Sequence, residues 1–493
     1  MANRKETGRR GSGRSLGRRP EAGTAAWRET LPVELNGIYE ADVIGLSHEG
    51  EGVGRVEGYT LFIHGALPGE RVRVRVSELK KQYGRADLLR VLEASPDRIA
   101  PACPIYERCG GCQLQHMSYD AQLHWKRQMV VDQLERIGKL RVAAADGEEQ
   151  GVVVHPTLGM QDAWRYRNKV QVPIGEQEGG LVGGFYMRES HTIVEMEQCL
   201  LQHEASDATV GRVKAIAREL GVTGYDPVRH EGLLRHVVVK HAAATGETMV
   251  VLVLNGDTLP REAEWVARLR EAVPGLVSLC LNVNPERTSQ VFGETTRVLW
   301  GREVLYDAIG TTRFAISARS FYQVNPVQTE ALYATALRYA GLTGRESVVD
   351  AYCGIGTISL FLAPHAREVY GVELVPEAVD DARANAELNG IRNVRFACGK
   401  AEEVLPAWRE QGGACDVVVV DPPRKGCDSR LLETIHALRP PRVVYVSCNP
   451  ATLARDLRVL EDGGYRTVEV QPVDMFPWTA HVECVIGLQR IET

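Results

Sequence analysis

The sequence has no long hydrophobic run and no apolar leader. Nowhere do its 493 residues approach the roughly 18 consecutive apolar residues of a membrane-spanning helix. The basic N-terminus also lacks the apolar stretch of about 7–15 residues that marks a secretory signal peptide. We therefore expect a cytoplasmic protein with no membrane partner, whose 11 cysteines are reduced thiols, ligands or catalysts and not disulfides.

Other absences restrict the ligands. No P-loop lysine is present, so nucleoside triphosphates are not expected. The Gly354-Ile-Gly356 turn has no third glycine, so a complete dinucleotide fingerprint is missing too. The sequence shows no internal repeat and no low-complexity segment beyond its N-terminal arm. Apolar residues at 44% and charged residues at 25% are ordinary for a globular protein, which excludes fibrous and wholly disordered chains.

Charge is unevenly distributed along the chain. The formal net charge of −6 argues against nucleic-acid binding over the whole surface. The first 20 residues, however, hold seven basic side chains against one acid, Glu6, with glycine and serine between them. Such a stretch cannot bury enough apolar surface to fold. We expect residues 1–32 to be a disordered basic arm, which either contacts RNA or only aids solubility.

Residues 33–93 have the pattern of a small β-barrel. Arginine and valine alternate over residues 71–76, and frequent glycines divide the segment into short strands. A barrel of this length suits an OB-like fold. Between residues 80 and 85, two lysines and an arginine lie close to Tyr83. Positive charge beside an aromatic ring favours a nucleic-acid patch, although a solvated basic face on an SH3-like barrel would give the same pattern.

The pattern changes again near residue 320. Residues 94–319 mix strand-like and helical stretches, including a helix predicted over 120–138, and indicate an α+β middle domain. Over 320–493, short apolar strands alternate with helices, which predicts a parallel, doubly wound α/β sheet. The predicted strands are 347–352, 368–373, 393–397, 416–420, 442–447 and 481–488.

A short glycine turn follows the first of these strands and opens a helix. Gly354 and Gly356 let the backbone turn sharply and approach a ligand closely at the carboxyl edge of the sheet. Glu373 ends the second strand, where a carboxylate can accept hydrogen bonds from ribose hydroxyls. The short pattern favours S-adenosylmethionine over NAD, although a structural turn is also compatible with it. Asp421, after the fourth strand, would face the reacting end of the cofactor. Arg424 stands where adenine N6 methyltransferases carry an aromatic residue, so methylation of adenine N6 is disfavoured.

Two more residues suggest covalent catalysis. Cys448 follows the fifth strand and precedes a proline-bent loop, so it is placed like a nucleophile over the crevice. A lone cysteine is otherwise more often a small buried residue. Glu483 lies in the apolar last strand, where loss of solvent raises the pKa of a carboxyl group and suits it to act as a base, unless it is a surface acid of an edge strand. A thiolate that adds to carbon 6 of uracil makes carbon 5 nucleophilic enough to accept a methyl group.

Three cysteines, Cys103, Cys109 and Cys112, fall within ten residues of one another. Four thiolates can hold an iron–sulfur cluster or a structural zinc ion. The spacing leaves both open and does not choose the fourth ligand between Cys199 and Cys280.

The motifs together resemble the class I RNA uracil-5 methyltransferase family from about residue 34 to the end. The resemblance rests on Phe-Tyr-Gln323-Val-Asn-Pro, Tyr352-Cys-Gly-Ile-Gly, Asp421-Pro-Pro-Arg, Ser-Cys448-Asn-Pro and His-Val-Glu483. The front of the chain is similar to the branch that acts on large-subunit (23S) ribosomal RNA. Gly-Glu-Gly-Val-Gly-Arg at 50–55 and Ala-Leu-Pro-Gly-Glu at 66–70 resemble its TRAM barrel, and the cysteine spacing resembles its iron–sulfur motif.

This resemblance implies a fold and a set of site residues. The fold would be a Rossmann-like class I methyltransferase domain (320–493) behind a TRAM RNA-binding barrel (33–93) and an α+β middle domain (94–319) carrying an iron–sulfur cluster. The implied roles are S-adenosylmethionine contacts for Gln323, Tyr352, Glu373 and Asp421, nucleophile for Cys448 and proton acceptor for Glu483. The implied 4Fe–4S ligands, with a structural or RNA-positioning role, are Cys103, Cys109, Cys112 and Cys199.

The resemblance also implies a function. The expected reaction is S-adenosylmethionine-dependent methylation of carbon 5 of one or two uridines in 23S ribosomal RNA, with the target base flipped out of a loop. The arm, the barrel and Arg165, Arg167 and Lys169 would contact phosphates. Trp164 and Tyr166 are candidates for stacking on bases, although aromatic residues in the pattern Trp-Arg-Tyr-Arg are as often part of the core. No obligate protein partner is expected.

Three alternatives remain. Transfer RNA uracil-5 methylation uses the same chemistry, but its family branch is expected to be shorter and to lack the barrel and the cluster. Cytosine-5 RNA methyltransferases usually pair two working cysteines, whereas one is well placed here; Cys427, in another motif loop, is the competing thiol. A non-catalytic RNA-binding ribosome-assembly factor would not need Cys448 and Glu483.

Overall fold

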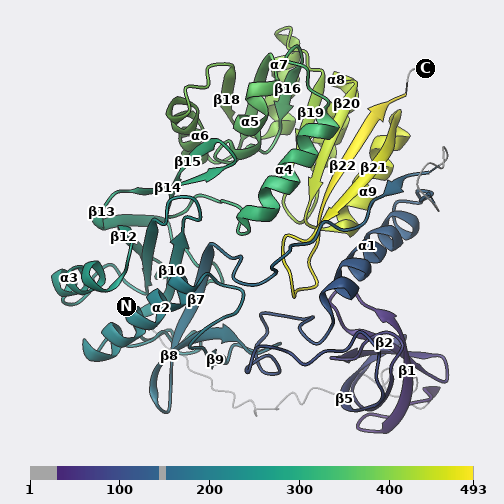
Figure 1. The fold of residues 1–493 in the computed structure, drawn as a ribbon, viewed down its shortest axis with the longest axis vertical. Helices are drawn as coiled ribbons and strands as arrows, with labels where there is room; N and C mark the ends of the chain where they lie inside the picture. Colours follow the sequence, from purple (N-terminus) through teal and green to yellow (C-terminus); the bar gives the residue numbers. More distant parts are fainter. Residues whose placement is uncertain (1–29, 144–150, 492–493) are drawn as a thin grey trace, which may run out of the picture. The chain divides into compact units, whose positions relative to one another are not determined.

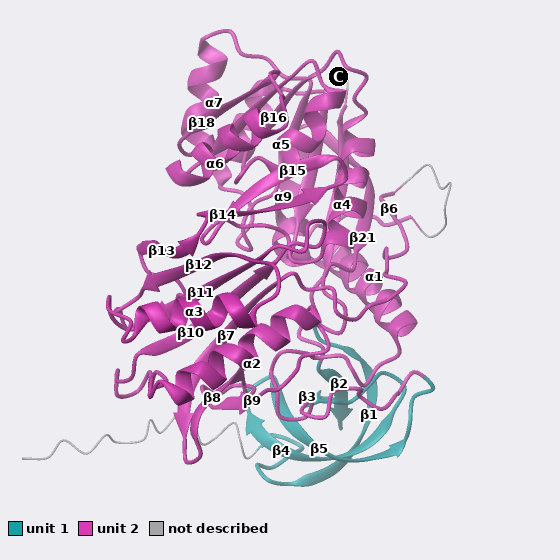
Figure 2. Cartoon of the chain, turned by 60° about the vertical axis from the view of Figure 1, so that its left-hand side comes forward, with its two compact units in different colours: residues 1–47, 51–96 teal, residues 48–50, 97–493 magenta. Residues whose placement is uncertain are grey.

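The computed structural model describes residues 30–143 and 151–491. The basic arm predicted for residues 1–32 therefore lies outside the described residues except for its last three. The described chain forms two compact units, one reaching to Ser47 and continuing from Glu51 to Pro96, the other comprising His48–Gly50 and the chain from Asp97 onward (Figure 2). Within the described chain, no helix is long and apolar enough to span a bilayer.

The first unit is a closed five-stranded barrel in the order β1-β2-β3-β5-β4, which confirms the predicted barrel. It follows from a period of two in the sequence, because alternate residues of a strand face opposite sides. In β4 the valines 72, 74 and 76 are fully buried, whereas the arginines between them are exposed. Glu70, in the turn before β4, is buried and accepts the backbone N–H groups of Leu67 and Ser95. The strands are β1 (Ile38–Leu46), β2 (Gly52–Val56), β3 (Tyr59–His64), β4 (Arg71–Leu79) and β5 (Tyr83–Glu93).

The basic side chains of the barrel are partly neutralised by acids. Arg71 and Arg73 both bind Glu40, each at 3.0 Å, and Lys80 lies 2.6 Å from Glu78. Tyr83 is 39% exposed, and its ring meets that of Phe62 edge to face, with 5.4 Å between the ring centroids.

The second unit contains a seven-stranded sheet in the order β13-β12-β11-β10-β7-β8-β9. Helices α2 (Glu204–Glu219) and α3 (Glu262–Ala272) pack against each other and against this sheet. Its central strands are apolar on both sides, because residues such as Val238 and Val251 also belong to the core shared with the C-terminal sheet. The strands are β7 (Lys169–Gln177), β8 (Gly180–Tyr186), β9 (Ile193–Glu195), β10 (Leu234–His241), β11 (Thr248–Leu254), β12 (Leu276–Val283) and β13 (Thr295–Gly301). A hairpin of β14 (Val304–Ile309) and β15 (Thr312–Ser317) follows.

The C-terminal part is an eight-stranded sheet in the order β18-β17-β16-β19-β20-β22-β21-β6 (Figure 1). Its strands are β16 (Ser347–Asp350), β17 (Glu368–Glu373), β18 (Val394–Cys398), β19 (Val417–Val420), β20 (Arg442–Ser447), β21 (Tyr465–Val473), β22 (Glu483–Arg490) and β6 (Val153–Val154). Helices pack against it from both sides, as the doubly wound prediction requires. They are α4 (Pro326–Ala340), α5 (Thr357–Leu362), α6 (Pro376–Leu388), α7 (Ala401–Glu410), α8 (Ser429–Leu438) and α9 (Pro450–Asp462).

Two features of this sheet differ from the sequence prediction. The sheet is not wholly parallel, because β22 runs antiparallel to both β20 and β21. Strand β21 was not predicted, because the buried polar residues Thr467 and Gln471 interrupt its apolar pattern. Distant segments also join the sheet: β6 pairs with β21, and α1 (Tyr119–Arg136), which covers most of the helix predicted over 120–138, packs on α9 and β21.

Candidate active site and cysteine pocket

The predicted functional residues gather at one edge of the eight-stranded sheet. Strands β16, β17, β19 and β20 are parallel neighbours, so their carboxyl ends share that edge. Glu373 is the last residue of β17, and Asp421 and Cys448 directly follow β19 and β20. Glu483 arrives from the opposite direction as the first residue of β22, whose next residue, Cys484, pairs with Ser447. The antiparallel register therefore brings Glu483 opposite Cys448.

The glycine turn is held by the predicted ribose-binding acid. Gly354 and Gly356 have φ values of 54° and 86°, in the left-handed region where glycine is favoured. The backbone N–H of Gly354 donates to Glu373 Oε2 at 3.1 Å, and that of Val375 donates to Oε1 at 2.9 Å. Glu373 is thus fixed in orientation at the turn. Leu374 and Val375, directly after it, are apolar and 58% and 47% exposed.

Gln323 and Tyr352, the other predicted cofactor contacts, lie in loops beside this edge. Gln323 is buried just before α4, and its carbonyl oxygen accepts a hydrogen bond from Asn168 Nδ2 at 2.9 Å. Tyr352 lies at the turn after β16, where burial raises the pKa of its hydroxyl group. A residue that the sequence did not single out, Tyr333 of α4, bonds Thr357 of α5 at 2.8 Å. Burial raises the pKa of Tyr333, and the charges of Asp421, Asp350 and Glu483 raise it further.

The loops after β19 and β20 are tied together by Asn449. Its side-chain oxygen accepts the N–H of Ala451, which caps α9, and its Nδ2 donates to the carbonyl oxygen of Arg424 at 3.0 Å. Asn449 therefore fixes the backbone beside Cys448. The Asn-Pro pair at a helix start is a sequence signal that could have identified it.

The site concentrates acidic groups. Burial, and then the charge of Asp350, raises the pKa of Asp421 to about 7. Burial also raises the pKa of Cys448 to about 11, with further contributions from Glu483 and Asp421. The pKa of Glu483 lies well above its usual range, chiefly through burial. Arg424 opposes these shifts at both Cys448 and Glu483. Such a site favours a bound cation, because positive charge stabilises each acid in its ionised form.

Competing thiols are less suitably placed. Cys427 is 6% exposed and its backbone N–H donates to Asp456, so it is a packed residue. Cys353 is 3% exposed. Cys448 is half-buried, which leaves it more accessible than either.

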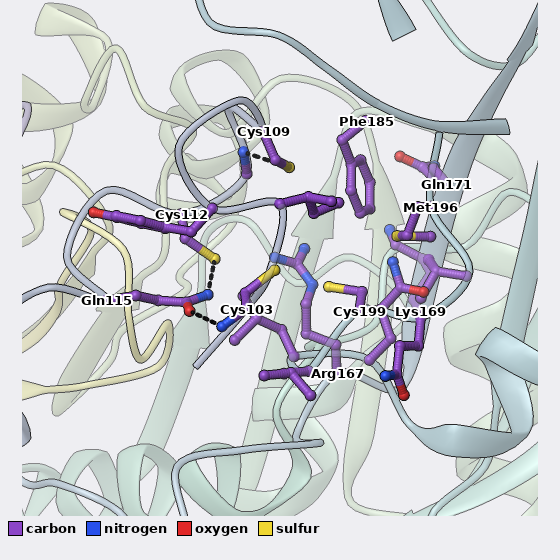
Figure 3. A pocket seen from close by; sticks show the side chains of 18 residues that line it. Cys103, Cys109, Cys112, Gln115, Arg167, Lys169, Gln171, Phe185, Met196 and Cys199 are labelled. Carbon is purple, nitrogen blue, oxygen red and sulfur yellow. Dashed lines mark hydrogen bonds between the residues drawn. The ribbon is translucent and has the colours of Figure 1, made fainter. Parts of the chain in front are cut away.

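The four cysteines Cys103, Cys109, Cys112 and Cys199 line one cavity of about 220 Å³ (Figure 3). Three come from one loop, and Cys199 comes from the segment before α2. Gln115 Nε2 donates to Cys112 Sγ at 3.2 Å, and the N–H of Gly111 donates to Cys109 Sγ at 3.4 Å. Burial raises the pKa of Cys112 to about 12 and that of Cys199 to about 11.

These cysteines do not form a site for a single ion. Among the described residues, no group of three or more His, Cys, Asp or Glu side chains is arranged to hold a metal ion. A structural zinc would need its four ligands within about 2.3 Å of one centre. The ligands of an iron–sulfur cluster bind different irons, so their sulfur atoms stand farther apart. The cavity brings the four thiols together, and the N–H···S bonds would stabilise thiolate ligands of either kind of group.

Three of the expected RNA contacts have partners within the protein. Tyr166 is 6% exposed and its hydroxyl donates to the carbonyl oxygen of Pro477, so the expectation that it stacks on a base is wrong. Trp164 stacks on Trp478, with 4.2 Å between ring centroids. Arg165 Nη1 is engaged with Asp207 at 2.6 Å.

Comparisons with known proteins agree with this arrangement. Residues 32–89 match the model of the TRAM domain, and residues 302–491 match the family described as tRNA (Uracil-5-)-methyltransferase. The solved structure of the Pyrococcus abyssi tRNA (uracil-54, C5)-methyltransferase, in complex with S-adenosyl-L-homocysteine, superimposes with a TM-score of 0.71 at 27% identity. The match covers 91% of this chain and 100% of that chain. The C-terminal fold is therefore that of a class I, Rossmann-like methyltransferase.

Similar sequences give the family. An uncharacterized RNA methyltransferase of Halalkalibacterium halodurans is 57% identical over 462 residues, which cover 94% of this chain and 99% of that protein. An uncharacterized RNA methyltransferase of Listeria monocytogenes is 50% identical over 460 residues, covering 93% and 99%. The chain belongs to the RNA uracil-5 methyltransferase family, with an N-terminal TRAM domain.

Proposed function

We propose that this protein methylates carbon 5 of uridine in 23S ribosomal RNA through a covalent intermediate on Cys448. The observation that carries the proposal is the register of β20 and β22, which sets a half-buried thiol opposite a buried carboxyl group at the carboxyl edge of the sheet. C5 methylation requires a nucleophile and a base close together, as at the ends of these two adjoining strands, whereas methylation at oxygen or nitrogen needs no thiol.

The proposed steps use these two residues in turn. The Cys448 thiolate attacks carbon 6, and the electrons of the ring double bond move to give an enolate. Carbon 5 of the enolate then takes the methyl group from the sulfonium of S-adenosylmethionine, which leaves as a neutral thioether. The Glu483 carboxylate removes the carbon 5 proton, the C–H electrons re-form the double bond, and the C6–S bond breaks to release Cys448 as thiolate.

The methyl donor would lie along the same edge. We propose that Glu373 accepts the ribose hydroxyls, that the glycine turn leaves room for close approach, and that Leu374 and Val375 cover the adenine. Gln323, Tyr352 and Asp421 complete the set of contacts. The acidity of the site supports this proposal, since a sulfonium carries the positive charge that the acids around Cys448 favour.

For the cysteine pocket we propose a 4Fe–4S cluster on Cys103, Cys109, Cys112 and Cys199. The convergence of two buried and two half-buried cysteines and the N–H···S bonds to two of them support it. With four protein ligands no iron is left open, so the cluster would be structural or would position RNA. Iron and sulfide analysis of protein purified without oxygen tests this; zinc, or no metal, would refute it.

The RNA substrate separates two candidates. Resemblance at the front of the chain supports 23S ribosomal RNA. Transfer RNA is the second candidate, favoured by the similarity to the P. abyssi tRNA enzyme. The expectation that tRNA uracil-5 methyltransferases are shorter than this chain is wrong for that enzyme, because it aligns with 91% of this chain. The two are distinguished by mapping 5-methyluridine in 23S and transfer RNA from cells with and without the gene. Loss in transfer RNA alone would overturn the ribosomal assignment.

The chemistry is tested by trapping. RNA containing 5-fluorouridine has no removable proton at carbon 5, so wild-type protein with S-adenosylmethionine should form an adduct that survives denaturation. Cys448→Ala should form none while still binding RNA. An adduct through another residue, or methylation by Cys448→Ala, would refute the mechanism.

A further inference from the structure

The residue proposed as base stands at the end of an irregular loop. Residues 474–482 connect β21 to β22, and Glu483 follows at once as the first residue of β22 (Figure 1). Strand pairing holds Glu483, opposite Val473 of β21, and the residues after it, but not the residues before it. The position of Glu483 therefore also depends on what holds the loop before it. Two anchors come from α1 and from the cysteine loop, and Ala163, Tyr166 and Asn325 make further hydrogen bonds to the loop.

The first anchor is a buried ion pair. Lys126 of α1 and Asp474 have fully buried side chains, and Nζ donates to Asp474 Oδ1 at 2.5 Å. The same Nζ donates to the carbonyl oxygen of Phe476 at 3.1 Å. Removing one partner of such a pair leaves an uncompensated charge in the interior, so the contact fixes the beginning of the loop strongly.

The second anchor holds Trp478. Its φ of 68° lies in the left-handed region, which a bulky side chain adopts only where its surroundings enforce it. The backbone N–H of Trp478 donates to Gln122 Oε1 at 3.1 Å. Its carbonyl oxygen accepts the N–H groups of Gln113 and Leu114 at 3.1 and 3.0 Å. The N–H group and the carbonyl group of Trp478 are thus both held by residues 113–122.

Further contacts extend this anchor. Trp478 Nε1 donates to the carbonyl oxygen of Ala163 at 3.0 Å, and its ring packs in one apolar cluster with Cys112. The N–H of Ala480 donates to Gln113 Oε1 at 3.4 Å, nearer still to Glu483. Because Gln113 adjoins Cys112, these contacts join the cysteine loop to the residue that we propose as base.

We infer that Gln122 and Lys126 are positioning residues, which hold the 474–482 loop so that Glu483 can reach the carbon 5 proton. The inference rests on the proposed function, because it concerns the step assigned to Glu483. A base must lie within hydrogen-bond reach of the proton that it removes, and a displacement of about 1 Å can slow a step about a hundredfold. Cys448 directly follows β20 and is not part of this loop, so we expect thiol addition and methyl transfer to depend on these anchors much less than proton removal by Glu483 does.

The variants are chosen to separate positioning from folding. Lys126→Met keeps the length and packing of the side chain but leaves Asp474 unpaired, which can also impair folding. Gln122→Met is the second variant. It removes the hydrogen bond to Trp478, and those from Nε2 to the carbonyl oxygens of Leu114 and Met117, without leaving a buried charge. The matched control is Arg235→Met. Arg235 is a buried cation that holds a different loop through the carbonyl oxygens of Asn284, Glu286 and Thr288.

The experiment follows methyl transfer and product release separately. Each protein is mixed with S-adenosylmethionine carrying a radioactive methyl group and with an unmodified uridine RNA that the wild type methylates. The radioactivity is followed in released RNA and in the denaturation-resistant protein–RNA adduct. We expect both positioning variants to transfer the first methyl group at close to the wild-type rate, to accumulate the adduct, and to turn over at least tenfold more slowly. Arg235→Met should accumulate no adduct.

The variant Glu483→Gln distinguishes failure of the positioning inference from failure of the proposed function. Suppose that Glu483→Gln accumulates the adduct and the positioning variants do not. The positioning variants then either turn over like the wild type, or lose methyl transfer and product release together, in proportion to their folded fraction. Either result overturns the positioning inference and leaves the proposed function standing. If Glu483→Gln releases product normally, the role of Glu483 fails and the inference fails with it. Adduct accumulation by Arg235→Met as well would show general destabilisation, and would also overturn the inference.

Discussion

The acidity of the Cys448 thiol should depend on the charge of the bound cofactor. In the protein alone, burial and the neighbouring carboxyl groups Glu483 and Asp421 raise the pKa of Cys448 to about 11. At pH 8 only about one thiol in a thousand would then be ionised. Since the thiolate is the nucleophile, such a site is nearly inert until something lowers that pKa.

A sulfonium beside the thiol would do so. A nearby positive charge favours the anionic form and lowers the pKa, typically by about 1–3 units. The thiolate fraction at pH 8 should therefore rise about ten- to thousandfold when S-adenosylmethionine binds. S-Adenosylhomocysteine has nearly the same shape but a neutral thioether, so it should occupy the site without this effect. The pH profile of Cys448 reactivity should therefore shift to lower pH with S-adenosylmethionine and should not shift in this way with S-adenosylhomocysteine.

Alkylation of Cys448 by iodoacetamide, followed by mass spectrometry of its peptide, measures this shift between pH 7 and 11. A cysteine-containing reference peptide in the same reaction serves as the standard, because the exposed Cys398 pairs with Glu373 and lies beside the proposed cofactor site. Equal rates with the two cofactors would refute the electrostatic argument. A slower rate with S-adenosylmethionine than with S-adenosylhomocysteine would show that the cation does not lie near the thiol.

Three further perturbations have defined outcomes. Arg424→Met should raise the pKa of Cys448, because the arginine charge opposes the shift; the alkylation profile should move to higher pH, and the difference should shrink at high salt. Gln115→Leu removes a hydrogen bond to Cys112 Sγ, so redox titration should give the proposed cluster a lower reduction potential, whereas a redox-silent pocket would contradict the cluster. Leu61→Ala empties a fully buried site in the barrel and should cost about 2–5 kcal/mol of barrel stability. Calorimetry should show an earlier barrel transition, and RNA affinity should fall while S-adenosylmethionine affinity does not; unchanged RNA affinity would argue against binding by the barrel.

Much of the architecture could be predicted where sequence pattern and structure have the same period. The alternation of arginine and valine in β4 identified a barrel strand, because one face of such a strand is buried and the other solvated. Strands β16, β17, β19 and β20 were identified for the same reason, as short apolar runs between helices. The polar residues at their ends could then be grouped, because parallel strands share a carboxyl edge.

Prediction failed where partners are distant in the sequence. Nothing local showed that β22 runs antiparallel to β20, yet that direction is what sets Glu483 opposite Cys448. Spacing alone did not choose Cys199 as the fourth cysteine, whereas the structure places it in the same pocket as the other three. Tyr166 looked like a stacking residue by composition, but its ring is buried.

The sequence by itself determined which side chains could do chemistry and at which strand ends they stand, because burial and turn preferences leave local periodic traces. Only the tertiary structure decided which of them meet. Lys126 and Asp474 are 348 residues apart, and the sequence around one residue does not indicate that the other is its partner. A buried charge must find a partner, but its identity depends on the packing of whole helices and sheets. Local sequence can therefore indicate that a group is buried, while only the folded chain determines what it is buried against.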